Sequence, residues 1–427
     1  MTGDRRSFAR IRARLHRDER GFTMIEVIVA ILIFGILITS VATTQSSSLN
    51  MIRNDRHRSV AANLAAEEMD TIRSTDFTDL TVGRVETTRD LDGIVYTVTR
   101  DSEWVLGDAQ SGACDAPADA EPRYLRVDVA VRWPVMSGVA PVTSNTIVTP
   151  PVGTYDETTG HIGVKIVDRD AAPVGGVNVT LAGPLSGSQT TTADGCAFFA
   201  FLPAGAYTAT VSAAGYVSDQ GVATPVQPAS VTVGATTSLL FQYDRAATLD
   251  LTLIGKDLGA PAPTGVAVTL ANAHMLPTGF EAFPGSGSPR QITDLFPFAD
   301  GYEAWAGTCA DASSGAPPLA VQPGSATAAT ILMPEVQVTV MQDLGGGTFA
   351  PVPSLPVQAV HVADGSCAGG ESYSLGVTDA AGQLAFALPW GTWDVQVSGF
   401  PNVVELDPSS APADGDGSWP FDVRLFS

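Results

Sequence analysis

The sequence predicts a chain that starts with one long transmembrane helix, continues as a small antiparallel sheet, and ends in three all-β sandwich units. Three observations support this order of an α+β module followed by all-β units. An apolar run covers residues 22–41. The first of the 29 prolines is Pro117, so proline, which interrupts helices, is confined to the later part of the chain. Beyond residue 153, strand and turn signals repeat about every 90 residues, which is the size of one sandwich domain.

The charge distribution excludes several classes of partner. The chain has 23 basic and 45 acidic residues and a formal net charge of −22. Such a surface opposes binding to nucleic-acid phosphates and to anionic lipid headgroups. Residues 1–21 hold seven arginines and are basic, whereas the remainder is strongly acidic. A basic leader, an apolar run and an acidic remainder indicate a leader that stays in the cytoplasm and later domains that are extracytoplasmic.

The apolar run is long enough to cross a membrane and holds a single charge. As a helix, residues 22–41 span about 30 Å, the thickness of the hydrocarbon core. Glu26 is the one ionisable residue in the run, and an ionised carboxylate in a bilayer costs about 2.5–3.5 kcal/mol, so Glu26 needs a cationic partner. Three alternatives remain open: a secretory signal cleaved near residues 40–42, an uncleaved signal anchor, and a twin-arginine signal at residues 5–8.

The segment GFTMIE at residues 21–26, between the basic leader and the apolar run, resembles the processing motif of type IV prepilins. The resemblance implies that a prepilin peptidase cleaves between Gly21 and Phe22 and that Phe22 is then N-methylated. It also implies that Glu26 pairs with an N-terminal amine during assembly with other pilin subunits through their N-terminal helices. The chain would be inserted in the membrane by this single helix, with the leader on the cytoplasmic side.

The residues after the apolar run predict the rest of a pilin module. The stretch from Phe22 to Ser74 lacks proline and has one glycine, and its apolar residues recur mostly at helical spacing, which predicts a transmembrane and stalk helix over residues 22–75. Residues 76–152 are expected to form the antiparallel sheet of a pilin head. Alternating apolar and polar residues predict its strands, which we expect at residues 95–98, 124–133 and 146–148.

The repeated pattern predicts three sandwich units, at residues 153–245, 246–335 and 336–427. Its marker is a Leu-Pro-x-Gly-x-aromatic segment that ends at Tyr207 in the first unit and at Trp393 in the third. The length of each unit is that of an immunoglobulin-like sandwich with seven strands. Residues 194–207 resemble the carboxypeptidase regulatory-like (transthyretin-like) domains, and the resemblance extends over residues 163–243. It implies that the glycine makes a hairpin turn and that the aromatic residue starts a core strand.

The cysteines suit an oxidising compartment. All four follow the apolar run, their number is even, and none forms a CxxC pair, so we expect disulfides rather than a metal site. Three connectivities are open, and the neighbouring pairs Cys114–Cys196 and Cys309–Cys367 are favoured. Related surface sandwiches form Lys–Asn isopeptide bonds, but Lys165 is one residue from the required position and Val211 replaces the assisting glutamate. We therefore expect no isopeptide bond here.

The sequence offers no catalytic, cofactor or metal site. The five histidines are scattered, and the signatures of zinc proteases, serine hydrolases, P-loops and dinucleotide-binding folds are missing from the sequence. Asp414 and Asp416 resemble only a fragment of a calcium loop. Trp390 is the candidate ligand contact, because it occupies the turn position that Ala204 holds in the first unit and the core does not require it there. Its ligand would be a surface glycan or a protein.

These features predict a minor type IV pilin-like structural subunit and not an enzyme. It would be processed by prepilin peptidase and incorporated into a type IV pilus or related filament, where its sandwich units are displayed at the cell surface, with adhesion as a secondary hypothesis. Two other functions stay open: a pseudopilin of a secretion system, and a single-pass surface binding protein with no role in a filament. The expected location is the cell membrane, and after assembly the pilus at the cell surface.

Overall fold

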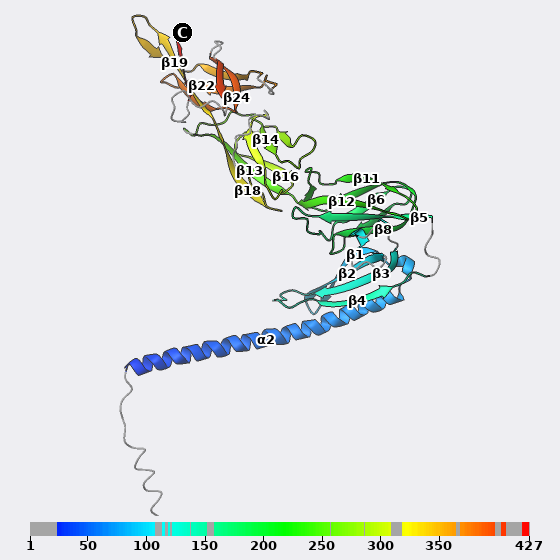
Figure 1. Cartoon of the computed structure of the whole chain (residues 1–427). Coiled ribbons are helices and arrows are strands. Elements are labelled where there is room, and N and C mark those ends of the chain that lie inside the picture. The colour runs from blue at the N-terminus through cyan, green and yellow to red at the C-terminus, as the bar shows by residue number, and fades with distance from the viewer. Residues whose placement is uncertain are drawn as a thin grey trace, which may run out of the picture. The chain divides into compact units, whose positions relative to one another are not determined.

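A computed structural model gives the arrangement of the chain (Figure 1). One α-helix is followed by β-sheets in sandwich-like pairs, which confirms the predicted fold class. Contacts divide the chain into two compact units, of which the first contains the helix as far as Ile72 with residues 86–99 and 129–144, and the second contains the remainder. The structure describes residues 24–106, 113–115, 118–119, 122–136, 138–151, 158–256, 258–285, 287–308, 318–363, 368–397, 403–406 and 421–426.

Helix α2 (Met24–Ser74) has two parts with different surroundings. Its first part, Met24–Ala42, is fully exposed, and it is the one segment among the described residues that is long and apolar enough to cross a membrane. The second part buries one face, as its helical apolar spacing predicts. The buried residues of that face are Ala61, Leu64, Ala65, Met69 and Ile72. In the first compact unit, His57 Nδ1 lies 2.8 Å from the hydroxyl of Tyr96.

The first sheet has four strands in the order β1-β2-β3-β4. Its strands are β1 (Gly83–Leu91), β2 (Ile94–Leu106), β3 (Pro122–Arg132) and β4 (Val142–Val148). In β3 the predicted alternation is confirmed, because Val127, Val129 and Val131 are all fully buried while Arg126 and Arg132 are exposed. Strand β1 was not expected from the sequence. Short 3-10 turns occur at η1 (Phe77–Asp79) and η2 (Ala113–Asp115).

The first sandwich packs the sheet β10-β12-β5-β8 against the sheet β11-β9-β6-β7. Its first and last strands pair in parallel, with Thr236 opposite His161 and Gln242 opposite Val167. The strands are β5 (Thr159–Val167), β6 (Asn178–Ala182), β7 (Gly187–Thr190), β8 (Cys196–Pro203), β9 (Gly205–Ser212), β10 (Tyr216–Ser218), β11 (Val226–Val231) and β12 (Thr236–Arg245).

The second sandwich has two three-stranded sheets, β16-β13-β18 and β15-β14-β17. Its first and last strands, β13 and β18, again pair in parallel. A single residue, Ala246, separates β12 from β13. The strands are β13 (Ala247–Gly255), β14 (Val268–Ala271), β15 (Phe280–Phe283), β16 (Arg290–Leu295), β17 (Glu303–Ala306) and β18 (Ala326–Met333).

The third sandwich packs the sheet β20-β19-β23 against the sheet β22-β21-β24-β25. Its last strand, β26, pairs in parallel with its first strand, β19, and Pro334 alone separates β18 from β19. The strands are β19 (Glu335–Asp343), β20 (Phe349–Pro351), β21 (Pro356–His361), β22 (Ser372–Val377), β23 (Gln383–Ala387), β24 (Gly391–Val397), β25 (Val403–Leu406) and β26 (Phe421–Phe426). The described parts of the three sandwiches thus have eight, six and eight strands instead of the seven expected for each.

The repeated Leu-Pro-x-Gly-x-aromatic marker has the same structure in the first and third sandwiches. Gly205 and Gly391 have φ values of +152° and +139°, where an L side chain is strained. The aromatic residue two positions later is buried and donates a hydrogen bond to the carbonyl of the preceding proline. This bond measures 3.0 Å from Tyr207 Oη in the first sandwich and 2.9 Å from Trp393 Nε1 in the third. The marker therefore fixes a turn and starts a core strand in both sandwiches.

Candidate functional site

Glu26 lies in the first turn of α2, where its negative charge complements the positive end of the helix dipole. It is the only charged residue of the exposed segment Met24–Ala42. The next basic residue toward the end of the helix is Arg53, which is about 40 Å away at the helical rise. Glu26 therefore has no intrahelical cation in that direction, and inside a bilayer its charge calls for an amine from another source. Gly21 and Phe22 lie outside the described residues.

A disulfide and an ion pair join the turn η2 to the first sandwich. Cys114 and Cys196 form a disulfide with a Cα–Cα distance of 5.7 Å, which is one of the two pairs favoured from the sequence. Next to it, Lys165 Nζ lies 2.7 Å from Asp115 Oδ2. Lys165 thus has an ionic partner in Asp115. Cys309 and Cys367 lie outside the described residues, so their pairing stays a prediction.

A row of aromatic rings also connects residues before the first sandwich to that sandwich. The ring of Trp104 lies 5.7 Å from that of Phe77 and 5.5 Å from that of Phe201, both edge to face. Phe201 also meets His161 at 5.3 Å, and its backbone N–H donates a hydrogen bond to His161 Nδ1. Burial of this imidazole lowers the pKa of His161 from 6.5 to about 4. His161 is therefore neutral at physiological pH, and its Nδ1 accepts this hydrogen bond in the core of the sandwich.

The neutral His161 makes the first sandwich sensitive to acid. Because its folded pKa is below its unfolded pKa, the unfolded chain binds a proton between pH 6.5 and 4 while the folded chain does not. We expect the stability of this sandwich to be complete above pH 6.5 and to fall as the pH decreases to 4. At about 1.4 kcal/mol for each pH unit, the loss approaches about 3 kcal/mol.

Hydrogen exchange of peptides from β5 and β8 at pH 7 and pH 4.5, corrected for intrinsic exchange, measures this loss. In His161→Gln the pH dependence of the exchange protection should decrease. In His274→Gln it should remain, since His274 is exposed and distant in the sequence from this core. An unchanged pH dependence in His161→Gln would show that another group titrates.

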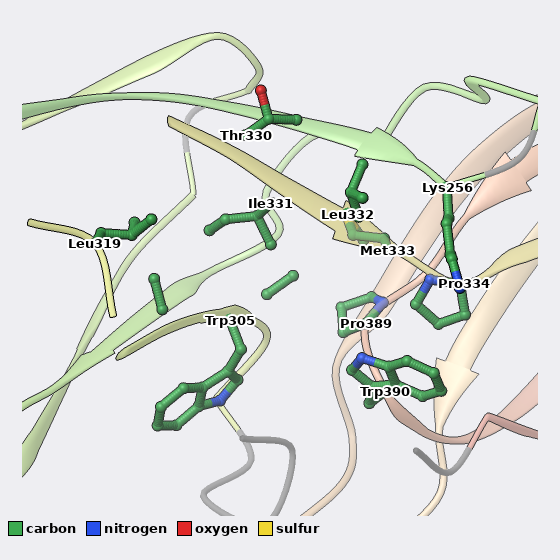
Figure 2. Close-up of a pocket in the computed structure, with 12 residues that line it drawn as sticks. Lys256, Trp305, Leu319, Thr330, Ile331, Leu332, Met333, Pro334, Pro389 and Trp390 are labelled. Carbon is green, nitrogen blue, oxygen red and sulfur yellow. The ribbon is translucent and has the colours of Figure 1, made fainter. Parts of the chain in front are cut away.

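Trp390, the candidate ligand contact, is half-buried and lines a cavity of about 390 Å³ (Figure 2). Trp305 is only 4% exposed and lines the same cavity. Phe296 and Phe298 are buried in the core, as is Trp393. The cavity lies where the second and third sandwiches meet, because its walls include strands β17 and β18 and the turn before β24.

The contact between these two sandwiches depends on a carboxylate that the sequence analysis did not identify. Glu335, the first residue of β19, is fully buried and accepts hydrogen bonds from the backbone N–H groups of Leu258 and Ala260. A second link is the 2.7 Å hydrogen bond from Thr308 Oγ1 to Glu371 Oε1. The sequence signal was an acidic residue directly before the alternating apolar strand, a position where a solvated charge is the usual expectation.

Among the described residues, no group of three His, Cys, Asp or Glu side chains is arranged to hold a metal ion. Asp414 and Asp416 lie outside the described part of the chain, as does Trp419. The geometry thus provides a lone carboxylate on an exposed apolar helix segment, a contact fixed by a disulfide and a cavity lined by two aromatic residues.

Two family models match parts of the chain. Residues 16–42 match the prokaryotic N-terminal methylation motif, and residues 161–242 match the carboxypeptidase regulatory-like domain. Both resemblances noted in the sequence are therefore confirmed. A comparison with curated proteins finds no match.

Solved structures of surface proteins and pilins show weak similarity. The Bacillus anthracis TIE protein is 12% identical, with 82% of this chain and 73% of that chain covered and a TM-score of 0.21. The minor pilin GBS52 of Streptococcus agalactiae is 16% identical, with 40% and 94% covered and a TM-score of 0.19. The major pilin SpaD of Corynebacterium diphtheriae is 10% identical, with 64% and 98% covered and a TM-score of 0.20.

The methylation motif overlaps the exposed apolar helix, since the matched residues 16–42 include the segment Met24–Ala42. A motif for leader processing and a helix of membrane-spanning length thus occupy the same stretch of chain. Together they support a pilin-like subunit that is anchored in the membrane and displayed at the surface.

Proposed function

We propose that this chain is a minor type IV pilin-like subunit. A prepilin peptidase would cleave between Gly21 and Phe22, and Phe22 would become the N-methylated first residue. Helix α2 would then carry the subunit from the membrane into a filament with other pilins, and the sandwiches would be displayed outside the cell. The leader would remain cytoplasmic. The role is structural and not enzymatic.

One observation carries this proposal: Glu26 is the sole charge on an otherwise apolar and fully exposed helix segment of membrane-spanning length. A plain membrane anchor gains nothing from a carboxylate at this depth, because the charge disfavours insertion. In a filament the same carboxylate is neutralised when it meets the new N-terminal amine of a neighbouring subunit. The motif match over residues 16–42 supports the cleavage that would create this amine.

The size of the displayed part favours a low-copy subunit. Three sandwiches follow the first sheet, and together they are several times larger than it. Repeating such a body at every position of a helical array of subunits would crowd neighbouring copies. We therefore expect the chain to be a small fraction of the protein in sheared filaments, and a stoichiometric amount would contradict the minor role.

Mass spectrometry of the mature N-terminus tests the proposal. We expect the wild-type chain to begin at N-methyl-Phe22 and Gly21→Val to keep its leader. Glu26→Gln should be processed normally and yet be lost from sheared filaments. Glu67→Gln is the matched control, since Glu67 is an exposed carboxylate in the second part of α2, and it should assemble like the wild type.

The same variants distinguish the two alternative functions. A single-pass surface protein without a filament role would be exported and displayed equally well with Gly21→Val and Glu26→Gln. A pseudopilin would be processed but would stay out of surface filaments, and Glu26→Gln would then impair protein secretion. A chain that begins at Thr43 would indicate an ordinary secretory signal and would contradict the proposal.

Adhesion is a second candidate function for the displayed sandwiches. The observation that favours it is the position of Trp390, a half-buried indole that lines a cavity where the sandwich core does not require it. Binding of labelled filaments to host or environmental surfaces, compared between the wild type and Trp390→Ala, tests this function.

A further inference from the structure

The cavity between the second and third sandwiches has a mainly apolar wall. Twelve residues line it, and among their side chains only those of Lys256 and Thr330 and the indole N–H groups of Trp305 and Trp390 can form hydrogen bonds. Its volume of about 390 Å³ is within the range of pockets that hold small organic molecules. A wall of this composition favours an apolar ligand body held in place by very few polar contacts.

Two indole rings form part of this wall. Trp305 is only 4% exposed, whereas Trp390 is half-buried and contacts it. Figure 2 shows the two rings beside different parts of the cavity, with Pro389 next to Trp390. Indole faces bind flat apolar groups by stacking and by edge-to-face contact. The ligand body that best fits this wall is therefore an aromatic ring system.

The one cation in the wall is Lys256, which Figure 2 places on the same side as Trp390. Its backbone N–H donates a 3.0 Å hydrogen bond to the carbonyl of Met333, so its Cα is fixed at the cavity. Its side chain is exposed, and no carboxylate among the described residues forms an ion pair with it. The nearby carboxylate of Glu335 accepts backbone N–H groups instead.

Because of Lys256, the cavity prefers a ligand with a negative charge. The sequence has only two lysines, and its net charge of −22 comes from acidic groups distributed over the whole chain. Beyond a Debye length of about 8 Å these distant charges are largely screened at physiological salt. An ammonium group at the edge of a low-dielectric wall then attracts a single negative charge more strongly than it would in water.

The cavity is held open by contacts on both sides. Leu388 N donates a 3.1 Å hydrogen bond to the carbonyl of Pro334, which connects the turn before β24 to the end of β18. Gly307 approaches Pro389 so closely that an added Cβ would lie 2.9 Å from the proline Cβ. Because these contacts belong to the fold of the two sandwiches, binding requires little ordering of the wall.

We propose that this cavity binds a small aromatic carboxylate. The aromatic ring lies against Trp305 and Trp390, and the carboxylate accepts a charge-assisted hydrogen bond from Lys256 Nζ. A neutral sugar fits poorly, since its many hydroxyl groups would outnumber the side-chain partners, which are Thr330, Lys256 and the two indole N–H groups. The cavity is thus a ligand site that is separate from the assembly role of α2.

Calorimetric titration of the full chain in detergent micelles tests this site, with empty micelles as the blank. The probes are indole-3-acetate and its neutral isostere indole-3-acetamide. We expect the acid to bind about three to five times more tightly than the amide, because the side chain of Lys256 is exposed and a solvent-exposed ion pair contributes at most about 1 kcal/mol. N-acetylglucosamine is expected to give no binding heat.

Lys256→Gln is the decisive variant, since an exposed side chain is changed and folding should be unaffected. It should lower the affinity for the acid to that for the amide. Lys165→Gln is the matched control, because it removes the only other lysine, which pairs with Asp115 away from the cavity. Trp390→Ala should lower the affinity for both probes. Equal affinity for acid and amide, an acid affinity that survives Lys256→Gln, sugar binding, or no binding by either probe would each overturn the proposal.

Discussion

Replacing Cys114 and Cys196 by serine is expected to lower the free energy of opening of the first sandwich by about 4 kcal/mol. The disulfide joins residues 82 positions apart, from the turn η2 to strand β8. In the chain-entropy model, closing a loop of this length removes many conformations from the unfolded chain. The folded state is thereby stabilised relative to the unfolded chain. The neighbouring contacts are too weak to replace it, since the ion pair between Lys165 and Asp115 is partly exposed and contributes at most about 1 kcal/mol.

Hydrogen exchange of peptides from β8 and from Ala113–Asp115 is the appropriate measurement. A chain with several domains does not unfold in one step, so a single midpoint would not report on this sandwich alone. We expect faster exchange in Cys114→Ser/Cys196→Ser and wild-type exchange at the same peptides in Cys309→Ser/Cys367→Ser. Protection within about 1 kcal/mol of the wild type in the first variant would mean that the other contacts hold this sandwich without the covalent link.

The sequence was most informative where a local pattern determines the structure. The absence of proline and the helical apolar spacing predicted a helix over residues 22–75, and α2 ends at Ser74, one residue earlier. The Leu-Pro-x-Gly-x-aromatic marker predicted turns and core positions, and both Tyr207 and Trp393 are buried there. In each case the cause is local: a glycine with positive φ, a proline without an N–H, or an apolar face of fixed period.

Strand β1 shows where a local pattern fails. Its sequence, GRVETTRDL, has no regular apolar alternation, and its last six residues are exposed at the edge of the sheet. Such a strand is held by backbone hydrogen bonds to β2 and buries few side chains, so periodicity cannot reveal it. The Asp92-Gly93 turn is the sequence signal of the hairpin that connects β1 to β2.

The ligand cavity and the buried Glu335 could not be predicted for a different reason. Trp305 and Trp390 are 85 positions apart, and their meeting depends on how two sandwiches contact each other. Likewise, the partners of Glu335 lie more than 70 positions earlier in the chain. Sequence spacing describes one element at a time, whereas these features arise from pairs of elements that are distant in sequence.

Substituting Gly255 by alanine is expected to destabilise the contact between the second and third sandwiches by about 3 kcal/mol or more. Gly255 is the last residue of β13, and an added Cβ would lie only 1.9 Å from Glu335 Oε1. Glu335 is fully buried, so its carboxylate can move only by giving up the N–H groups of Leu258 and Ala260. Each buried N–H group left without an acceptor costs about 1–3 kcal/mol.

A double-mutant cycle separates the clash from the loss of the carboxylate. Glu335→Ala alone should be destabilising by about 2–4 kcal/mol, since both N–H groups lose an acceptor. Because it also empties the space that the new Cβ requires, Gly255→Ala/Glu335→Ala should be less destabilised than the sum of the single variants by at least about 1 kcal/mol. Hydrogen exchange of peptides from β13 and β19 measures all three variants.

Gly187→Ala is the matched control for the glycine substitution. Gly187 is also a strand glycine, but the nearest atom to its added Cβ would be a ring carbon of Phe199 at 3.7 Å, an ordinary contact. This variant should change stability by less than about 0.5 kcal/mol. If Gly255→Ala behaved like Gly187→Ala, or if the double variant were fully additive, Glu335 would not be the residue that fixes the two sandwiches to each other. In that case the cavity wall around Trp390 would have to depend on the Thr308–Glu371 and Leu388–Pro334 hydrogen bonds instead.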